Sequence, residues 1–283
     1  MTPDLASRLS YAIARTRHAH RREAEGAPIV VFSMAKTGSS ALAAGLRAAK
    51  AGPVYHVHDL DQGLLACEEA EYRWSGRPWR IWDARRLLRR PPTPEAPWRV
   101  VSVVRDPIAQ TVSAFFQPGV RRGYVHPSAT VELLRERFGD RLDHLPLRWF
   151  DSHVRPALGI DVYATQSEPE QRYQIISTPL VRLLLLRFED LVVAPVALAQ
   201  LLGVPDPIDV PRVNVAAEKI YADLYESFRR SLHPTSTQLD RAYGSQLVRR
   251  FYTADEIGRF RAIWTGAAPD PSASAPTGDQ VAR

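Results

Sequence analysis

Apolar runs alternate with stretches of helical spacing along most of the chain. The runs at 29–32, 100–104 and 179–187 predict buried strands, because a strand that is covered on both faces is apolar throughout. Shorter runs at 53–57 and 79–82 predict two further strands, with helices between them. Strands that alternate with helices form a mostly parallel sheet with helices on both faces. We therefore predict an α/β fold in a single large domain.

The alternation weakens after residue 116, where the pattern predicts more irregular structure. The expected elements are a loop over 117–124, helices over 128–138 and 145–154, and short strands over 161–163 and 173–176. Further helices are expected over 195–202, 215–232 and 236–251. Thr253 is followed by Glu256 at the third position, which predicts a capping box at the start of a last helix, 254–264.

The first strand leads into a short polar loop, Lys36-Thr-Gly-Ser-Ser40, and then into a helix. Such a turn aims free backbone N–H groups at an anion. Gly38 lets the backbone approach a ligand closely, and Lys36 adds a positive charge. The loop is not a Walker motif, which needs two glycines with Lys directly after the second. The alternative interpretation is an ordinary turn with Ser39 as the N-cap of the helix.

A second strand-to-helix turn carries Arg105 at the strand end and Ser113 about two helical turns later. A guanidinium and a hydroxyl in these positions suit a second phosphate group. The alternative for Arg105-Asp106-Pro107 is an Arg–Asp pair within a turn.

Residues that follow parallel strands gather at one edge of the sheet. Lys36, His58, Asp83 and Arg105 all follow predicted strands, so we expect them to line the same edge. Two anion-binding turns at one edge indicate a ligand with two separated phosphate groups.

These turns resemble motifs of a known superfamily. Lys36-Thr-Gly-Ser-Ser40 resembles the 5′-phosphosulfate loop of sulfotransferases that use 3′-phosphoadenosine 5′-phosphosulfate (PAPS), and Arg105 through Ser113 resembles their 3′-phosphate motif. Leu186-Arg-Phe-Glu-Asp-Leu191 is similar to a later stretch of the same superfamily. More narrowly, the chain resembles the bacterial group labelled capsular polysaccharide synthesis proteins, which are carbohydrate sulfotransferase-like. The matching pieces are Val57-His-Asp-Leu60, Arg148-Trp-Phe-Asp151, Leu158-Gly-Ile-Asp-Val-Tyr163 and Arg250-Phe-Tyr-Thr-Ala-Asp-Glu-Ile257.

The resemblance implies a P-loop-like sulfotransferase fold and transfer of a sulfuryl group from PAPS to a carbohydrate hydroxyl. The product would be 3′-phosphoadenosine 5′-phosphate, and the transfer requires no metal. Lys36 would bond the bridging oxygen between phosphorus and sulfur, where charge develops. The remaining donor-binding roles would fall to Thr37, Gly38, Ser39 and Ser40 at the 5′-phosphate and to Arg105 and Ser113 at the 3′-phosphate.

A hydroxyl acceptor also needs a base. His58 is the first candidate, because an imidazole titrates near neutral pH, and His56 shares its face of the strand. Asp83 is the rival, since the base follows the third strand in several carbohydrate sulfotransferases. Either residue has a structural alternative, His58 as a polar cap and Asp83 as an ion-pair partner. Trp149 suits stacking on a sugar ring, although core packing is its default role.

The chain is basic, with 37 Lys and Arg against 31 Asp and Glu, and favours anionic partners. A sulfotransferase therefore competes with two other hypotheses, a P-loop-like nucleotide kinase or NTPase and a non-enzymatic binder of acidic glycan or nucleic acid. Basic and aromatic residues are not interleaved as base stacking would require, so we expect a glycan or another hydroxyl-bearing acceptor and no nucleic acid.

The expected organisation is a leading helix over 1–27, an α/β domain over 28–266 and a disordered tail over 267–283. Segment 117–178 departs most from strand–helix order and is expected to bind the acceptor or act as a lid. Cys67 is the only cysteine, so no internal disulfide forms. No apolar run approaches a membrane span, and we expect a cytoplasmic protein.

Overall fold

The computed structural model of the chain describes residues 26–72, 79–121, 123–126, 128–166, 169–211 and 221–266. Its contacts group into two compact units. The first comprises Met1–Arg105 and Arg148–Val215, and the second comprises Asp106–Leu147 and Ala216–Arg283. The predicted domain over 28–266 extends across both, and the predicted acceptor segment is divided between them at residue 147. Most of the predicted leading helix and the whole predicted tail lie outside the described residues.

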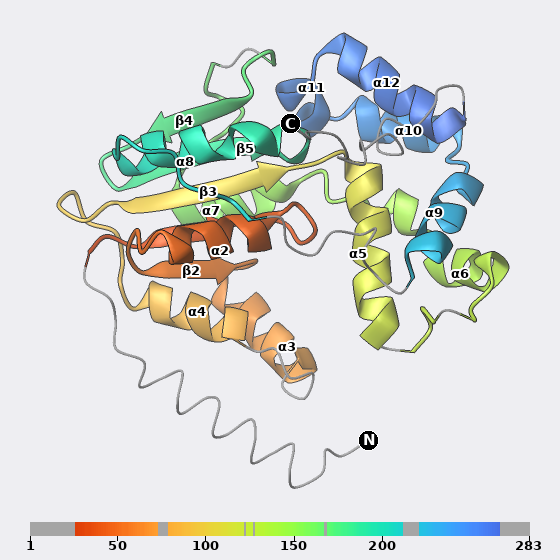
Figure 1. The fold of residues 1–283 in the computed structure, drawn as a ribbon, viewed down its shortest axis with the longest axis horizontal. Helices are drawn as coiled ribbons and strands as arrows, with labels where there is room; N and C mark the ends of the chain where they lie inside the picture. The colour runs from red at the N-terminus through yellow and green to blue at the C-terminus, as the bar shows by residue number, and fades with distance from the viewer. Residues whose placement is uncertain are drawn as a thin grey trace, which may run out of the picture. The chain divides into compact units, whose positions relative to one another are not determined.

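The first unit is built on a five-stranded sheet with the order β2-β1-β3-β5-β4. Figure 1 labels β2, β3, β4 and β5 of this sheet. Every neighbouring pair is parallel except β4 and β5, which run antiparallel. The strands are β1 (Ile29–Phe32), β2 (Val54–Val57), β3 (Trp98–Val104), β4 (Tyr173–Ser177) and β5 (Val181–Arg187). A mostly parallel sheet flanked by helices confirms the predicted α/β class, and β1 has the predicted bounds.

Both faces of this sheet are covered. On one face, α2 (Ser39–Ala48) and α8 (Ala194–Leu202) share an apolar core with alternate residues of β1, β3 and β5. On the other face, the ring of Trp149 meets the edge of Phe32 with 5.3 Å between centroids. The four strand residues Ile29–Phe32 are therefore all buried, as the continuous apolar run predicted.

Shorter helical segments complete the first unit. Helix α4 (Trp79–Leu88) packs against β2, the edge strand. A π-helix, η2 (Phe150–Val154), continues into α7 (Arg155–Leu158), and a 3-10 helix, η3 (Phe188–Val193), connects β5 to α8. The remaining helix is α3 (Gln62–Tyr72). Wide helical turns of this kind occur often at functional sites.

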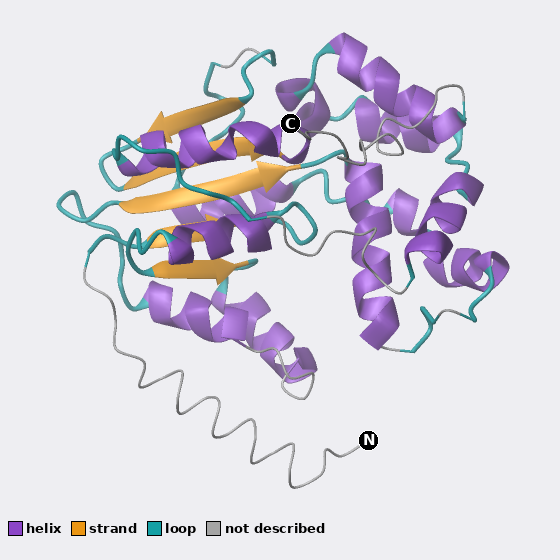
Figure 2. Ribbon diagram, viewed as in Figure 1, coloured by secondary structure: helices purple, strands orange, loops and turns teal. Residues whose placement is uncertain are grey.

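The described part of the second unit consists of helices and their connections (Figure 2). They are α5 (Pro107–Arg121), α6 (Val131–Phe138), the 3-10 turn η1 (Arg141–Asp143), α9 (Ala222–Ser231), α10 (Ser236–Tyr243), α11 (Gln246–Phe251) and α12 (Ala254–Thr265). A cluster of aromatic rings forms the core of this unit, with Phe228 in edge or stacked contact with Phe115, Phe116 and Phe138.

Asp106 anchors the second unit. Its carboxylate is 5% exposed and accepts hydrogen bonds from the Tyr243 hydroxyl at 3.1 Å and from the Trp264 indole N–H at 3.0 Å. It also accepts from the backbone N–H of Ile108, which closes the start of α5. Burial, followed by this carboxylate, raises the pKa of Tyr243 far above its ordinary value. The sequence pattern offered an Arg–Asp pair within a turn only as an alternative here, and it did not predict the two aromatic donors.

The predicted strand over 79–82 is wrong, because these residues begin helix α4. The buried apolar residues after Trp79 are Ile81, Trp82, Ala84 and Leu87. Ile81, Ala84 and Leu87 recur every three residues, as on one face of a helix, and this spacing overrides the brief alternation over four residues. Asp83 therefore lies within a helix and does not follow a third strand.

Other differences concern where elements end. Residues 161–163 form turns where a strand was predicted, and α5 runs to Arg121 through part of the predicted loop at 117–124. The predicted helix over 236–251 divides at Gly244, because Ser245 caps a new helix by accepting from the N–H of Val248. The capping box at the start of α12 is confirmed, with Thr253 and Glu256 each bonded to the other's backbone N–H.

Candidate functional site

The loop between β1 and α2, which we call the Lys36 loop (residues 33–40), has an unusual backbone. Lys36 has φ 68° and Gly38 has φ 79°, so both lie in the left-handed region. A side chain at Gly38 would be strained at this φ and would place a Cβ 2.6 Å from the Leu191 side chain in η3, so glycine fits this position best. A lysine held in this region stores strain of about 1–3 kcal/mol, which is typical of ligand-binding loops.

The loop presents backbone donors. Gly38 is the N-cap of α2 and makes no side-chain cap, so the alternative with Ser39 as N-cap is wrong. Within the described part of the chain, the N–H groups of Gly38, Ser39 and Ser40 have no hydrogen-bond partner. Unpaired N–H groups at a helix start carry partial positive charge. The arrangement is therefore suited to an anion.

Buried hydroxyls hold the loop in this shape. Ser33 shares a 2.7 Å hydrogen bond with Thr37 and donates to the carbonyl of Val103 at 3.0 Å. The Thr37 hydroxyl lies 2.8 Å from the carbonyl of Met34. Both Ser33 and Thr37 are fully buried. Thr37, predicted to hold a phosphate with its hydroxyl, thus has that group engaged inside the loop.

Arg105, at the end of β3, lies beside the loop. Its Nη1 donates to the carbonyl oxygen of Lys36 at 2.9 Å, and its guanidinium stacks 4.0 Å above the ring of Phe188. The structure thus brings Lys36 and Arg105 together at the carboxyl edge of the sheet. Ser113 lies on α5 in the second unit, so its predicted role at the 3′-phosphate stays a prediction.

Two histidines hold the two ends of the Lys36 loop. His56 lies in β2, and His58 directly follows this strand. His56 Nε2 lies 3.0 Å from the Ser39 hydroxyl, and His58 Nδ1 lies 2.6 Å from the carbonyl oxygen of Ser33. Since a carbonyl only accepts, Nδ1 of His58 carries the proton and its Nε2 accepts from Arg80. Burial, then the Arg80 guanidinium, lowers the pKa of His58 to about 3. The same causes hold the pKa of His56 well below its ordinary value.

His58 and Asp83, the two candidate bases, both contact other groups of the protein. His58 has both ring nitrogens occupied, so it has no lone pair ready for an acceptor proton. Asp83 is buried beside β2, where it accepts from the backbone N–H of His56 at 3.5 Å and lies 3.7 Å from Arg47 Nη2. It thereby covers an N–H of an edge strand. These contacts favour the structural alternatives for both residues.

A third histidine lies at the same edge of the sheet, and sequence reasoning missed it. His153, in η2, has Nε2 3.5 Å from the Oδ2 of Asp59, which follows β2 by two residues. Its ring stacks on Trp149 with 4.4 Å between centroids. Trp149 is itself buried, with its N–H 3.4 Å from the Ser102 hydroxyl, so its default role in packing is what the structure shows. We call Asp59 and His153 the Asp59–His153 pair.

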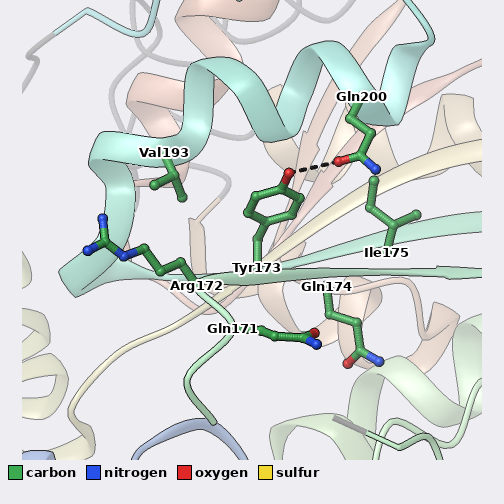
Figure 3. A pocket seen from close by; sticks show the side chains of 7 residues that line it. All are labelled: Gln171, Arg172, Tyr173, Gln174, Ile175, Val193 and Gln200. Carbon is green, nitrogen blue, oxygen red and sulfur yellow. Dashed lines mark hydrogen bonds between the residues drawn. The ribbon is translucent and has the colours of Figure 1, made fainter. Parts of the chain in front are cut away.

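A shallow hollow lies on the edge strand β4, away from these residues. It is lined by residues 171–175, Val193 and Gln200, and the Tyr173 hydroxyl donates to Gln200 within it (Figure 3). None of the predicted site residues lines this hollow. The chemistry-bearing side chains gather instead around the Lys36 loop, near the opposite edge strand.

The described residues contain no group of three or more His, Cys, Asp or Glu side chains placed to hold a metal ion. Among the helices that the structure describes, none is both long and apolar enough to cross a membrane.

Comparison with known proteins gives one match. Residues 125–253 match the model of a protein family described as "Putative capsular polysaccharide synthesis protein". No curated protein and no solved structure matches the chain. The match includes His153 but begins after the Lys36 loop and Arg105. The expected resemblance to capsular polysaccharide synthesis proteins is confirmed over this segment, and the wider resemblance to sulfotransferases stays a prediction.

Proposed function

We propose that the chain is a sulfotransferase that moves a sulfuryl group from PAPS to a hydroxyl of a polysaccharide or other glycan. The observation that carries the proposal is the 2.9 Å hydrogen bond from Arg105 to the carbonyl of Lys36. It joins the cationic end of β3 to the loop that presents free N–H groups. The two turns that the sequence marked as anion sites thus lie within reach of one ligand.

The donor set fits a nucleotide with phosphate groups at two positions. The N–H groups of Gly38, Ser39 and Ser40 suit the 5′-phosphate, and the Lys36 ammonium would add a positive charge to the same loop. Arg105 supplies a planar, permanently charged fork that suits a second phosphate. Its present contact with a carbonyl is weaker than a contact with a dianion, so the guanidinium can exchange one for the other.

PAPS supplies a sulfuryl group already attached to a good leaving group, a phosphate. The work left to the protein is to hold the donor and acceptor in line and to neutralise the charge that develops. The braced loop fixes the N–H donors in advance, and Lys36 would supply a cation where the leaving phosphate gains charge. An uncharged glycan hydroxyl is the acceptor that the capsular polysaccharide family description favours.

Calorimetry with adenosine 3′,5′-bisphosphate, the product without its sulfuryl group, tests the proposal. We expect binding without added metal, and a loss of affinity of about 10–100-fold in both Lys36→Ala and Arg105→Ala, because each loses a charge-assisted contact. Lys50→Ala is the matched control, since Lys50 is also a lysine at positive φ but lies exposed beyond the far end of α2.

Preference for Mg-ATP over the bisphosphate would instead support a kinase or NTPase. Absence of binding to either nucleotide would contradict the proposal and favour a non-enzymatic glycan binder.

A further inference from the structure

The Asp59–His153 pair differs from the other histidine contacts of the first unit in one respect. Nδ1 of His153 is buried and has no hydrogen-bond partner in the structure. A buried polar atom without a partner costs about 1–3 kcal/mol, and such atoms are rare in folded proteins. An atom of this kind calls for an explanation, such as a role in chemistry.

The pair lies at the same carboxyl edge of the sheet as the Lys36 loop, since Asp59 follows β2 and the loop follows β1. Asp59 directly follows His58, which is bonded to the carbonyl of Ser33, the first residue of the loop. His153 stacks on Trp149, whose ring meets Phe32, the residue before Ser33. Two short chains of contacts therefore connect the pair to the start of the loop.

The ring of His153 is held in a defined orientation. Trp149 fixes its plane, with an angle of 20° between the two rings, and Asp59 lies 3.5 Å from its Nε2. Asp59 is itself held, because its Oδ1 accepts from the backbone N–H of Asp61 at 2.8 Å. A carboxylate that faces one nitrogen of an imidazole selects the tautomer whose lone pair is on the other nitrogen and stabilises the imidazolium when it forms. Here that other nitrogen is Nδ1.

His153 is also reachable. Its side chain is 27% exposed, whereas Asp59 beneath it is 10% exposed. Nδ1 itself has no contact with solvent, so the acceptor must displace the atoms over it before a hydroxyl can bond there. Catalytic hydrogen bonds often form only in the complex with substrate.

We propose that His153 is the general base for the acceptor hydroxyl, and that Asp59 orients it. This inference rests on the proposed function. In the transfer, the acceptor oxygen forms a bond to sulfur while the bond from sulfur to the phosphate oxygen of PAPS breaks, and its electron pair leaves on the phosphate. The acceptor proton passes to Nδ1 of His153, which gives an imidazolium beside the Asp59 carboxylate.

The test measures transfer of label from ³⁵S-labelled PAPS to a panel of polysaccharides, together with calorimetry of adenosine 3′,5′-bisphosphate. We expect His153→Gln to bind the bisphosphate as the unaltered protein does and to lose about 10²–10⁴-fold in kcat, the range for loss of a general base. Asp59→Asn, which keeps the shape of the side chain, should lower kcat by about 10-fold or more and also leave bisphosphate binding unchanged.

A matched control exists in the second unit. His144 and Asp140 form an exposed His–Asp pair at 3.2 Å, with side chains 74% and 77% exposed. His144→Gln should leave both transfer and binding unchanged.

The outcomes separate the two proposals. If the unaltered protein transfers label and His153→Gln transfers it equally fast, the base assignment is wrong and the proposed function stands. If His153→Gln loses bisphosphate binding together with transfer, the histidine has a structural role and the assignment is again overturned. If the unaltered protein neither binds the bisphosphate nor transfers label, the proposed function fails, and the base assignment fails with it.

Discussion

Two regions at one edge of the sheet use histidine in opposite ways. At the end of β2, both ring nitrogens of His58 are occupied, by the Ser33 carbonyl and by Arg80. In η2, His153 has one nitrogen facing Asp59 and the other without a partner. The first arrangement fixes a neutral imidazole as a structural support. The second leaves a lone pair unused, which is what proton transfer requires.

The comparison shows that a histidine at a strand end is not by itself a base. The sequence placed His58 where a base belongs, but the groups around it consume its hydrogen-bonding capacity. A histidine can accept a proton from a substrate when its neighbours fix the orientation of the ring but leave one ring nitrogen without a hydrogen bond.

The largest effect is expected when His58, the histidine that supports the Lys36 loop, is replaced. His58→Leu should destabilise the protein by about 3 kcal/mol, because it leaves the Ser33 carbonyl and Arg80 without a partner they now have. Urea unfolding of the variant and of His144→Leu, an exposed site expected to change by less than about 0.5 kcal/mol, gives the difference. A loss at His58 no greater than at His144 would contradict the bracing role.

The pH dependence of stability sharpens the same point. The pKa of His58 is about 3 in the folded chain, so the unfolded chain takes up a proton below its ordinary value of 6.5 while the folded chain does not. Stability from this neutral histidine is complete above pH 6.5 and declines as the pH falls towards 3. Between pH 7.5 and 5 the loss should be about 2 kcal/mol, and the lowered pKa of His56 adds in the same direction.

The measurement is the free energy of unfolding at several pH values. His58→Gln cannot take up the proton, so its stability should fall less steeply than that of the unaltered protein over this range. Equal slopes for the two proteins would show that His58 is not held neutral.

The smallest effect on stability is expected at His153 in η2. His153→Gln should change the free energy of unfolding by less than about 1 kcal/mol, because a partly exposed His–Asp contact of 3.5 Å contributes little to stability. Thermal denaturation of this variant beside His58→Leu compares the two histidines directly. A loss at His153 as large as that at His58 would remove the distinction between a structural and an available histidine.

Much of the sheet was predictable because its strands are apolar on both faces. Ile29–Phe32 and the four leucines at 183–186 stand out as continuous apolar runs, which are typical of strands buried on both faces. The same argument failed at Trp79–Trp82. Four residues are too few to separate a period of two from a period of 3.6, and the deciding residues, Ala84 and Leu87, come later.

The sequence predicted only those parts of the candidate site that directly follow a strand. The Lys36 loop and Arg105 each follow a strand, so topology alone places them at one edge. Asp59 and His153 are far apart in sequence, and no local pattern joins them. The one available signal was the spacing of Trp149 and His153, four residues apart on a helical segment, which predicts contact between their rings but not the carboxylate opposite.

Asp106 has a consequence for how the chain matures on the ribosome. Its carboxylate depends on donors from Tyr243 and Trp264, which emerge well over a hundred residues later. Until translation passes residue 264, the beginning of α5 carries a negative charge that the finished protein buries. The second unit therefore cannot complete its assembly until its last helix, α12, has been made.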